Sequence, residues 1–292
     1  WARLVASEGY TRLKAREASL GRAFTDSAFR AFVESPELAA RREALAATLE
    51  GWRAVDMAAP ARVAFRYLPP DAAIRARVYP VIKPQTNSFV FETRTNPAIF
   101  LYLDPEVSPA DLANTVAHEL HHIGFAAACP PPDPAGLPQG GRDARDWLGG
   151  FGEGLAMLAA AGGADVDPHA TSGAEERAVW EAAVARVPED MARLESFFLD
   201  LVAGSMTEEE ATTRGFTFIV SEGVPQGPFY SVGWHMAATV ERELGRDRVV
   251  AGVCDAVGLL EDYNRAAAAE EARTGRAGPR WSEGLLEALR GR

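Results

Sequence analysis

The chain has little lysine and no long apolar run, and both absences limit what it can do. Lys14 and Lys83 are the only lysines, and 41 Asp and Glu residues outnumber 30 Lys and Arg residues, which gives a formal net charge of −11. Because the phosphates of nucleic acids attract basic surfaces, this charge argues against a nucleic-acid partner. No apolar run reaches the roughly 20 residues that cross a bilayer, so no membrane span is expected.

Cysteine is also scarce, with only Cys129 and Cys254 in the 292 residues. The two can pair only if the fold brings them together, and a free, buried thiol at each position is an equal alternative. The abundance of arginine and alanine suggests a bacterial source. The sequence begins at Trp1 and shows no signal peptide. We therefore expect either an exported or periplasmic protein whose leader is absent from this sequence, or a cytoplasmic one.

Hydrophobic periodicity gives the organisation of the chain. Residues 1–60 carry helix formers and predict an N-terminal helical segment that packs on the core and ends near Pro60, while residues 61–292 are expected to form one further region. After Ser108 the chain is expected to be mostly helical, apart from a loop rich in proline and glycine over residues 128–142. Short strands are predicted from β-branched and aromatic residues at 63–67, 74–82, 88–91 and 98–103. Strands followed by helices predict a helix-rich α+β fold.

One of the predicted helices contains an HExxH motif, His118-Glu119-Leu120-His121-His122. Residues four apart project from one face of a helix, so His118 and His122 can bind a single metal ion. Glu119 lies beside them and can accept a proton from water during hydrolysis. His121 points elsewhere and is expected to be solvated or to support the ligands. Three of the five histidines occupy these five positions, which favours a metal site over an amphipathic helix with incidental histidines.

The boundaries of this helix can also be predicted. Ser108 followed by Pro109 is typical of a helix start, with Ser108 as the N-cap. The prolines that begin at Pro130 end the helix just after Cys129.

A catalytic zinc normally takes three protein ligands, and the third is best sought in residues 147–164. Glu153 is the only charged residue from Trp147 to Ala164, and a lone carboxylate in apolar surroundings needs a partner or a metal. The glycines near Glu153 are expected to let its segment approach the HExxH helix closely. Asp143 and Asp146 are the fallback ligands, and a solvent-facing or arginine-paired Glu153 is the alternative.

Two groups in a later segment can assist catalysis. Pro228 suits a helix start and Gly245 a C-cap, so a helix of about four turns is predicted. The hydroxyl of Tyr230 can donate a hydrogen bond to an oxyanion, and His235 can do the same or protonate a leaving amine. The alternative is that both side chains belong to the core. His169 lies in a loop-like stretch and is expected to be exposed.

These motifs resemble those of the gluzincin class of zinc metallopeptidases. The resemblance rests on the HExxH motif and on Gly152-Glu153-Gly154-Leu155-Ala156 some thirty residues later, and it covers roughly residues 80–245. The segment around Tyr230 is similar to the Tyr-x-x-Gly helix of uncharacterised bacterial zinc-dependent peptidases. The resemblance implies a zincin-like core, in which a small mixed sheet packs on the HExxH helix. It also implies one Zn²⁺ ion held by His118, His122 and Glu153.

The sequence therefore predicts a zinc-dependent hydrolase, with a metallopeptidase acting on peptide or protein substrates as the first hypothesis. Glu119 is the expected general base, and Tyr230 and His235 are the expected helpers. One strand among residues 87–103 is expected to hold an extended peptide by main-chain hydrogen bonds. Two alternatives remain open, namely a zinc hydrolase acting on a non-peptide ester or amide and a non-catalytic metal-binding or interaction domain. The oligomeric state is left open as well.

Overall fold

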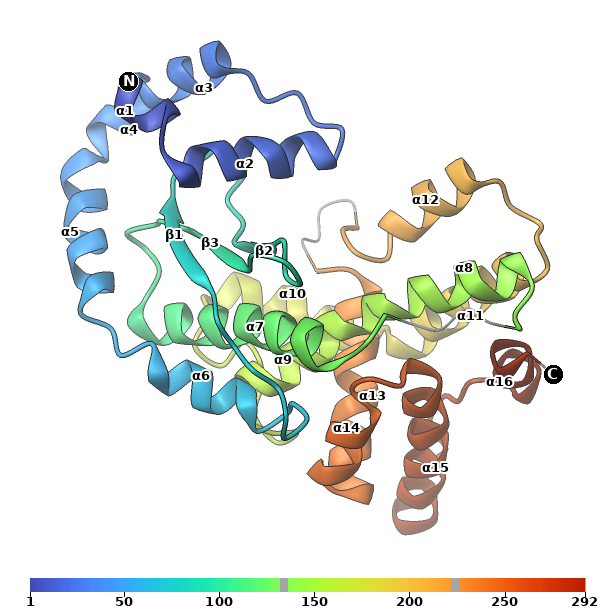
Figure 1. The fold of residues 1–292 in the computed structure, drawn as a ribbon. Helices are drawn as coiled ribbons and strands as arrows, with labels where there is room; N and C mark the ends of the chain where they lie inside the picture. Colours follow the sequence, from blue (N-terminus) through green and yellow to red (C-terminus); the bar gives the residue numbers. More distant parts are fainter. Residues whose placement is uncertain (132–135, 222–225, 292) are drawn as a thin grey trace.

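The fold is built on a three-stranded mixed sheet surrounded by helices (Figure 1). The computed structural model describes residues 1–131, 136–221 and 226–291. The strands are β1 (Arg77–Val81), β2 (Phe89–Phe91) and β3 (Ala98–Tyr102), in the order β1-β3-β2. The central β3 is parallel to β1 and antiparallel to β2. The expected helix-rich fold with a small mixed sheet is therefore confirmed.

The central strand is apolar because helices cover both faces of the sheet. Successive side chains of a strand point to opposite faces. Ile99 and Leu101 join a cluster with apolar residues of α7 (Pro109–Ala128), whereas Ala98 and Phe100 join a cluster with Leu13 of α2 (Glu8–Ser19). In Figure 1, α2 and α7 accordingly lie on opposite sides of the sheet. This packing places the HExxH helix directly against the sheet.

The helix α7 has the boundaries that its sequence predicts. Ser108 is its N-cap and accepts a hydrogen bond from the backbone N–H of Asp111 at 3.1 Å, with Pro109 at the first helical position. Cys129 is the C-cap. One apolar face of the helix is buried under the sheet, through Leu112, Val116, Leu120 and Ile123.

The N-terminal part of the chain is helical, as predicted, and curves around the sheet. Its helices are α1 (Ala2–Val5), α2, α3 (Asp26–Val33), α4 (Pro36–Ala40), α5 (Arg42–Arg53) and α6 (Ala58–Phe65). The strand predicted at residues 63–67 is wrong, since this segment forms the end of α6 and the turn that follows. Alanines before it favour a helix. Pro60, expected to end a helix, lies in the first turn of α6, where a missing N–H leaves no bond unmade.

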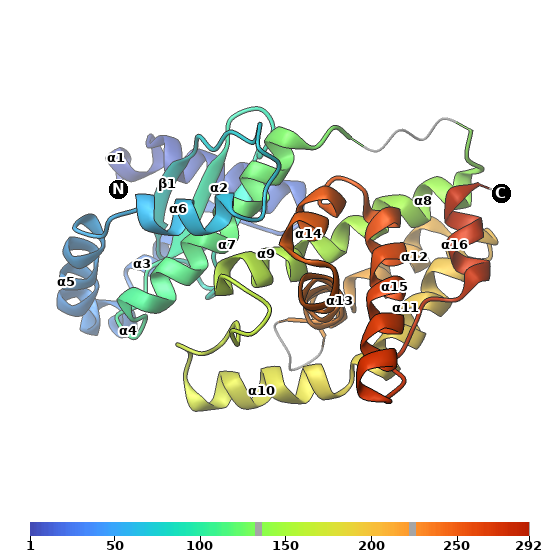
Figure 2. The same cartoon turned by 90° about the horizontal axis from the view of Figure 1, so that it is seen from below.

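A second and larger core is formed by helices in the C-terminal half (Figure 2). Phe151, Phe197, Phe198 and Phe229 are almost completely buried in it. The helix α13 has the predicted start and C-cap. The helices of this half, with one 3₁₀ turn, are α8 (Gln139–Leu148), η1 (Gly149–Phe151), α9 (Gly152–Ala161), α10 (Ala174–Ala185), α11 (Val187–Val202), α12 (Glu208–Phe216), α13 (Pro228–Leu244), α14 (Arg246–Gly252), α15 (Ala256–Thr274) and α16 (Glu283–Arg290).

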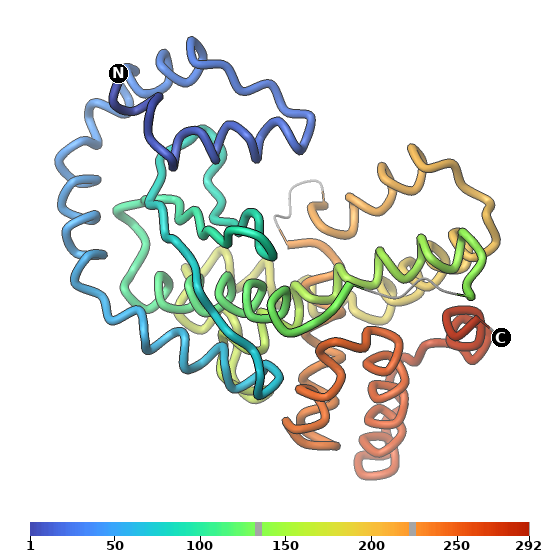
Figure 3. Tube along the Cα trace, in the orientation of Figure 1, coloured from blue at the N-terminus to red at the C-terminus, as the bar shows by residue number. Residues whose placement is uncertain are grey.

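The two ends of the chain lie on opposite sides of the molecule (Figure 3). Among the described residues, each helix is too short or too polar to span a bilayer.

The loop predicted over residues 128–142 is shorter than expected, because α8 already begins at Gln139. Residues 132–135 of that prediction lie outside the described residues.

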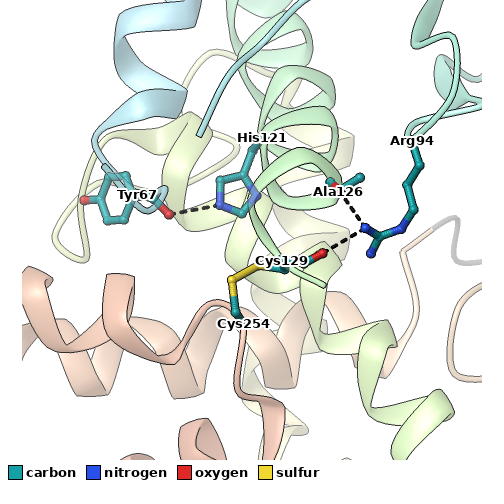
Figure 4. The surroundings of a disulfide bond; sticks show 6 residues. All are labelled: Tyr67, Arg94, His121, Ala126, Cys129 and Cys254. Atoms are coloured by element: carbon teal, nitrogen blue, oxygen red, sulfur yellow. Dashed lines mark hydrogen bonds between the residues drawn. A yellow bond between two sulfur atoms is a disulfide. The ribbon is translucent and has the colours of Figure 1, made fainter. Parts of the chain in front are cut away.

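Cys129 and Cys254 form a disulfide that joins the end of α7 to the segment between α14 and α15 (Figure 4). Their α-carbons lie 5.1 Å apart, within the usual range for a disulfide. The sequence left open whether the two cysteines are free thiols or form a disulfide, and the structure shows the disulfide. Arg94 strengthens the same helix end, because its guanidinium donates to the carbonyls of Ala126 at 2.7 Å and Cys129 at 2.8 Å. These carbonyls have no partner within the helix.

Candidate metal centre

Three predicted ligand side chains meet where α7 packs against α9. His118 and His122 face Glu153, which lies in the first turn of α9. The Nε2 atom of each histidine is 3.2 Å from Oε2 of Glu153, and the two Nε2 atoms are 3.0 Å apart. Among the described residues, these three form the one group of His, Cys, Asp and Glu side chains placed to hold a metal ion.

The spacing of the three atoms fits a zinc ion. Ligand atoms bonded to one tetrahedral Zn²⁺ at about 2.0–2.1 Å lie about 3.3 Å from one another. The observed separations of 3.0–3.2 Å are close to that value. Two imidazole nitrogens and one carboxylate oxygen are also a donor set that catalytic zinc sites use. The residues present therefore fit the ion, and a tetrahedral site would keep its fourth position for water or substrate.

The segment that carries Glu153 is held by glycines, but against a different helix from the one expected. A Cβ atom on Gly154 would lie 2.1 Å from the backbone nitrogen of Trp234, and one on Gly150 would lie 2.7 Å from the ring of Phe229. Both contacts are with α13. α9 packs against both α7 and α13, but the glycines allow the close approach to α13 and not to the HExxH helix. Gly152 has no atom within 4 Å of its Cβ position.

The three side chains interact strongly through their charges. Burial opposes the charged form of Glu153, but the two histidines outweigh it and hold the pKa of the carboxyl well below its usual range. Burial alone would lower the pKa of His122. The negative charge of Glu153 opposes this effect and raises the pKa to about 9. The side chains of His118, His122 and Glu153 keep 13, 18 and 27% of their surface exposed, so a substrate can reach them.

Glu119 lies beside the two histidines, as expected, and is deeply buried. Only 7% of the residue is exposed. Burial raises the pKa of its carboxyl, and the nearby imidazoles of His118 and His122 offset part of that rise. A carboxylate in such surroundings accepts a proton more readily than one in water.

Tyr230 lies beside His118, one of the three proposed ligands. Its ring is parallel to the ring of His118, with 6.4 Å between centroids and 7° between planes. Burial and the negative charge of Glu153 raise the pKa of the Tyr230 hydroxyl far above its usual value. The hydroxyl therefore stays protonated at any physiological pH and is available as a hydrogen-bond donor.

The structure does not bring His235 to this cluster. His235 follows Tyr230 by five residues, which turns it about 140° around α13. Its Nε2 atom is 3.3 Å from the hydroxyl of Tyr263 on α15, and the two rings lie edge to face. Burial, and next the charge of Arg242, lower the pKa of His235 to about 4.

Two other histidines are placed differently from the expectation. His121 is not solvated, because it is only 1% exposed and its Nε2 atom donates to the carbonyl of Tyr67 at 3.3 Å. Tyr67 could not be linked to His121 from the sequence, because it lies 54 residues away and outside every motif. His169 is partly buried, and its Nε2 atom lies 2.8 Å from Oε1 of Gln226, just before α13.

The fallback ligands stay away from the three-residue group. Asp143 and Asp146 lie on α8, where the Asp143 carboxylate accepts a hydrogen bond from Gln139 and Asp146 is exposed. Neither is part of the group placed to hold a metal.

Comparison with known proteins gives one result. No curated protein and no solved structure matches this chain. A family model described as "Putative zinc dependent peptidase (DUF5700)" matches residues 1–272, and the chain therefore belongs to that family.

Proposed function

We propose that the protein is a zinc-dependent peptidase of the gluzincin class, with one Zn²⁺ held by His118, His122 and Glu153. The observation that carries the proposal is the triangle of ligand atoms with sides of 3.0–3.2 Å, next to a buried glutamate in an HExxH motif. The family description also points to a zinc-dependent peptidase. All the proposed site residues lie between 118 and 230, which supports a catalytic region within residues 61–292.

The chemistry divides between the ion and the protein. A bound Zn²⁺ would lower the pKa of water toward neutrality and polarise the carbonyl that is attacked. Glu119 accepts the proton of the attacking water and passes it to the leaving nitrogen. The raised pKa of Glu119 suits the first of these steps, because its carboxylate accepts a proton more readily than one in water.

Tyr230 is proposed to stabilise the oxyanion. Its hydroxyl is kept protonated by burial and by Glu153, and its ring lies parallel to that of the ligand His118. A donor fixed where negative charge develops lowers the barrier without reorganising during the reaction. We leave His235 out of this mechanism, since its polar contact is with Tyr263.

The sheet offers a place for the substrate backbone. Of the strands within residues 87–103, β3 is central and β2 is at an edge. β2 also packs against α7. We propose that β2 holds an extended peptide by main-chain hydrogen bonds, as an added strand. The small mixed sheet beside the HExxH helix supports the proposal of a zincin-like core.

The disulfide bears on where the protein folds. Disulfides persist in oxidising compartments and are rare in the bacterial cytosol. The Cys129–Cys254 pair supports an exported or periplasmic protein over a cytoplasmic one. Absence of thiol labelling in protein from the periplasmic fraction, under denaturing conditions, would support this assignment, and two labelled thiols would contradict it.

The test of the function compares the parent with Glu119→Gln on a panel of quenched peptides, with and without chelator. The expected result is chelator-sensitive cleavage by the parent and its loss in Glu119→Gln, with zinc content unchanged. Glu106→Gln, an exposed position just before α7, is the control and should keep full activity. Cleavage by Glu119→Gln at the parent rate would contradict the mechanism. Parallel ester and non-peptide amide substrates identify the bond that is cleaved.

A further inference from the structure

The proposed site is carried by α7, α9 and α13. Besides their contacts at the site, these helices are joined at Tyr67. This residue lies in the turn after α6 and is 1% exposed. Its backbone carbonyl accepts a hydrogen bond from His121, the residue immediately before the ligand His122. Tyr67 is thereby attached to the HExxH helix through a residue that is not one of the proposed ligands.

The hydroxyl of Tyr67 makes the connection to the other two helices. It donates to the carboxylate of Glu241 on α13, 3.0 Å from each oxygen. The same carboxylate accepts from the backbone N–H of Ala164, three residues past the end of α9, at 3.0 Å. Arg246 completes the group, with its Nε 3.1 Å from Glu241 and its guanidinium 5.1 Å from the centre of the Tyr67 ring.

Glu241 has the partners that a buried carboxylate requires. Only 11% of its side chain is exposed, and an unpaired charge at such a position is costly. Its carboxylate oxygens accept hydrogen bonds from three segments of the chain, through Tyr67, Ala164 and Arg246. Because donors from separate parts of the chain converge on one group, the group fixes their relative positions.

The distances along the helices show why this second junction matters for the site. Glu241 follows Tyr230 by eleven residues on α13, and Ala164 follows Glu153 by eleven residues. The two helices already touch at Gly154 and Gly233. Glu241 lies eight residues, or about two turns, beyond Gly233 on α13, so the second junction lies away from the glycine contact and helps to fix the angle between the helices.

We propose that Tyr67 and Glu241 are positioning residues that hold α7, α9 and α13 at the angles at which His118, His122 and Glu153 share one ion and Tyr230 lies against His118. The inference rests on the proposed function. It predicts that removal of one hydroxyl, well away from the ligands, alters the metal site itself. Ligand geometry must be held to about half an ångström for full affinity and activity.

The test uses Tyr67→Phe, which keeps the ring and the backbone carbonyl and removes only the bond to Glu241. Tyr263→Phe is the matched control, because it also removes a buried hydroxyl. That hydroxyl donates to the carbonyl of Pro279 at 2.8 Å and lies 3.3 Å from Nε2 of His235 on α13, but it is not part of the junction at Glu241. For each variant, Zn²⁺ affinity is measured by chelator competition, the visible spectrum with Co²⁺ bound, and kcat and KM on a cleaved peptide.

Tyr67→Phe is expected to weaken Zn²⁺ binding about tenfold or more, the lower end of what supporting residues of metal ligands contribute. Its Co²⁺ spectrum should shift and kcat should fall while KM changes less than kcat. Tyr263→Phe should leave the spectrum and Zn²⁺ affinity unchanged. Should Tyr67→Phe not fold, Glu241→Gln replaces it, since the amide cannot accept all the bonds that the carboxylate does.

Two results would overturn the inference. Parent-like Zn²⁺ affinity, Co²⁺ spectrum and kcat in a folded Tyr67→Phe would show that the junction does not act on the site. Equal losses in Tyr263→Phe would show a general effect of destabilisation. The proposed function stands in both cases, whereas a parent that binds no Zn²⁺ overturns the function and this inference together.

Discussion

Gly154 of α9 and Gly233 of α13 meet backbone to backbone. A Cβ atom on Gly233 would lie 3.1 Å from the α-carbon of Gly154, and one on Gly154 would overlap the backbone of α13. This contact brings Glu153, the neighbour of Gly154, to the same place as Tyr230. Glycine is required here for close approach and not for its freedom at positive φ.

We predict that Gly154→Ala forces the two helices apart and removes Glu153 from the metal site. Zinc affinity should fall at least tenfold and peptidase activity should fall with it, because the ligand triangle opens. Gly152→Ala is the control on the same helix, where an added methyl group meets nothing within 4 Å. It should be neutral or stabilise the protein by up to about 1 kcal/mol. Equal zinc affinity in the two variants would rule out the proposed role of the contact.

Tyr230→Phe tests the oxyanion role without changing the metal ligands. The ring can still lie parallel to that of His118, but the donor is lost. We expect kcat to fall by about 10²-fold, the usual cost of one such donor, while KM and zinc content change little. A variant with parent-like kcat would show that Tyr230 only packs against the ligand.

The disulfide should contribute substantially to stability. It closes a loop with a sequence separation of 125 residues, and in the chain-entropy account loops of this size stabilise by about 4–5 kcal/mol. Replacing both Cys129 and Cys254 by alanine should lower the free energy of unfolding by a comparable amount in urea titrations. Reductant should destabilise the parent to the same extent and leave the double variant unchanged. A parent that is insensitive to complete reduction would contradict this prediction.

His235 should make the protein sensitive to mild acid. Its pKa is lowered from 6.5 to about 4 in the folded protein, so the folded state favours the neutral imidazole. The stability this provides is complete above pH 6.5 and is lost as the pH falls toward 4. The loss amounts to about 3 kcal/mol by the pKa difference. Unfolding free energies of the parent and His235→Phe at pH 7 and 4 measure it, and equal acid losses in both would contradict the assignment.

The sequence predicted the local features of the site better than its surroundings. The caps of α7, the spacing of His118 and His122, and the isolation of Glu153 all depend on residues close together in the chain, where helix geometry and the cost of a lone charge apply directly. The error at residues 63–67 also has a local cause, since a run of five residues, four of them apolar, is too short to define a hydrophobic period.

The remaining features depend on contacts between distant residues. Three such contacts join segments that lie 79 to 174 residues apart: the pairing of Cys129 with Cys254, the junction of Tyr67 with Glu241 and the approach of Gly154 to Gly233. Periodicity and spacing carry no information about such contacts. The same limit explains His235, which is on the predicted helix but faces α15 and not the site.

Zinc content of the purified protein tests the central claim most directly. The parent should contain one equivalent of Zn²⁺, and Glu153→Ala should lose it. Asp146→Ala, which removes the exposed fallback carboxylate on α8, should retain it. A parent with no bound zinc, or a Glu153→Ala variant that retains a full equivalent, would contradict the account.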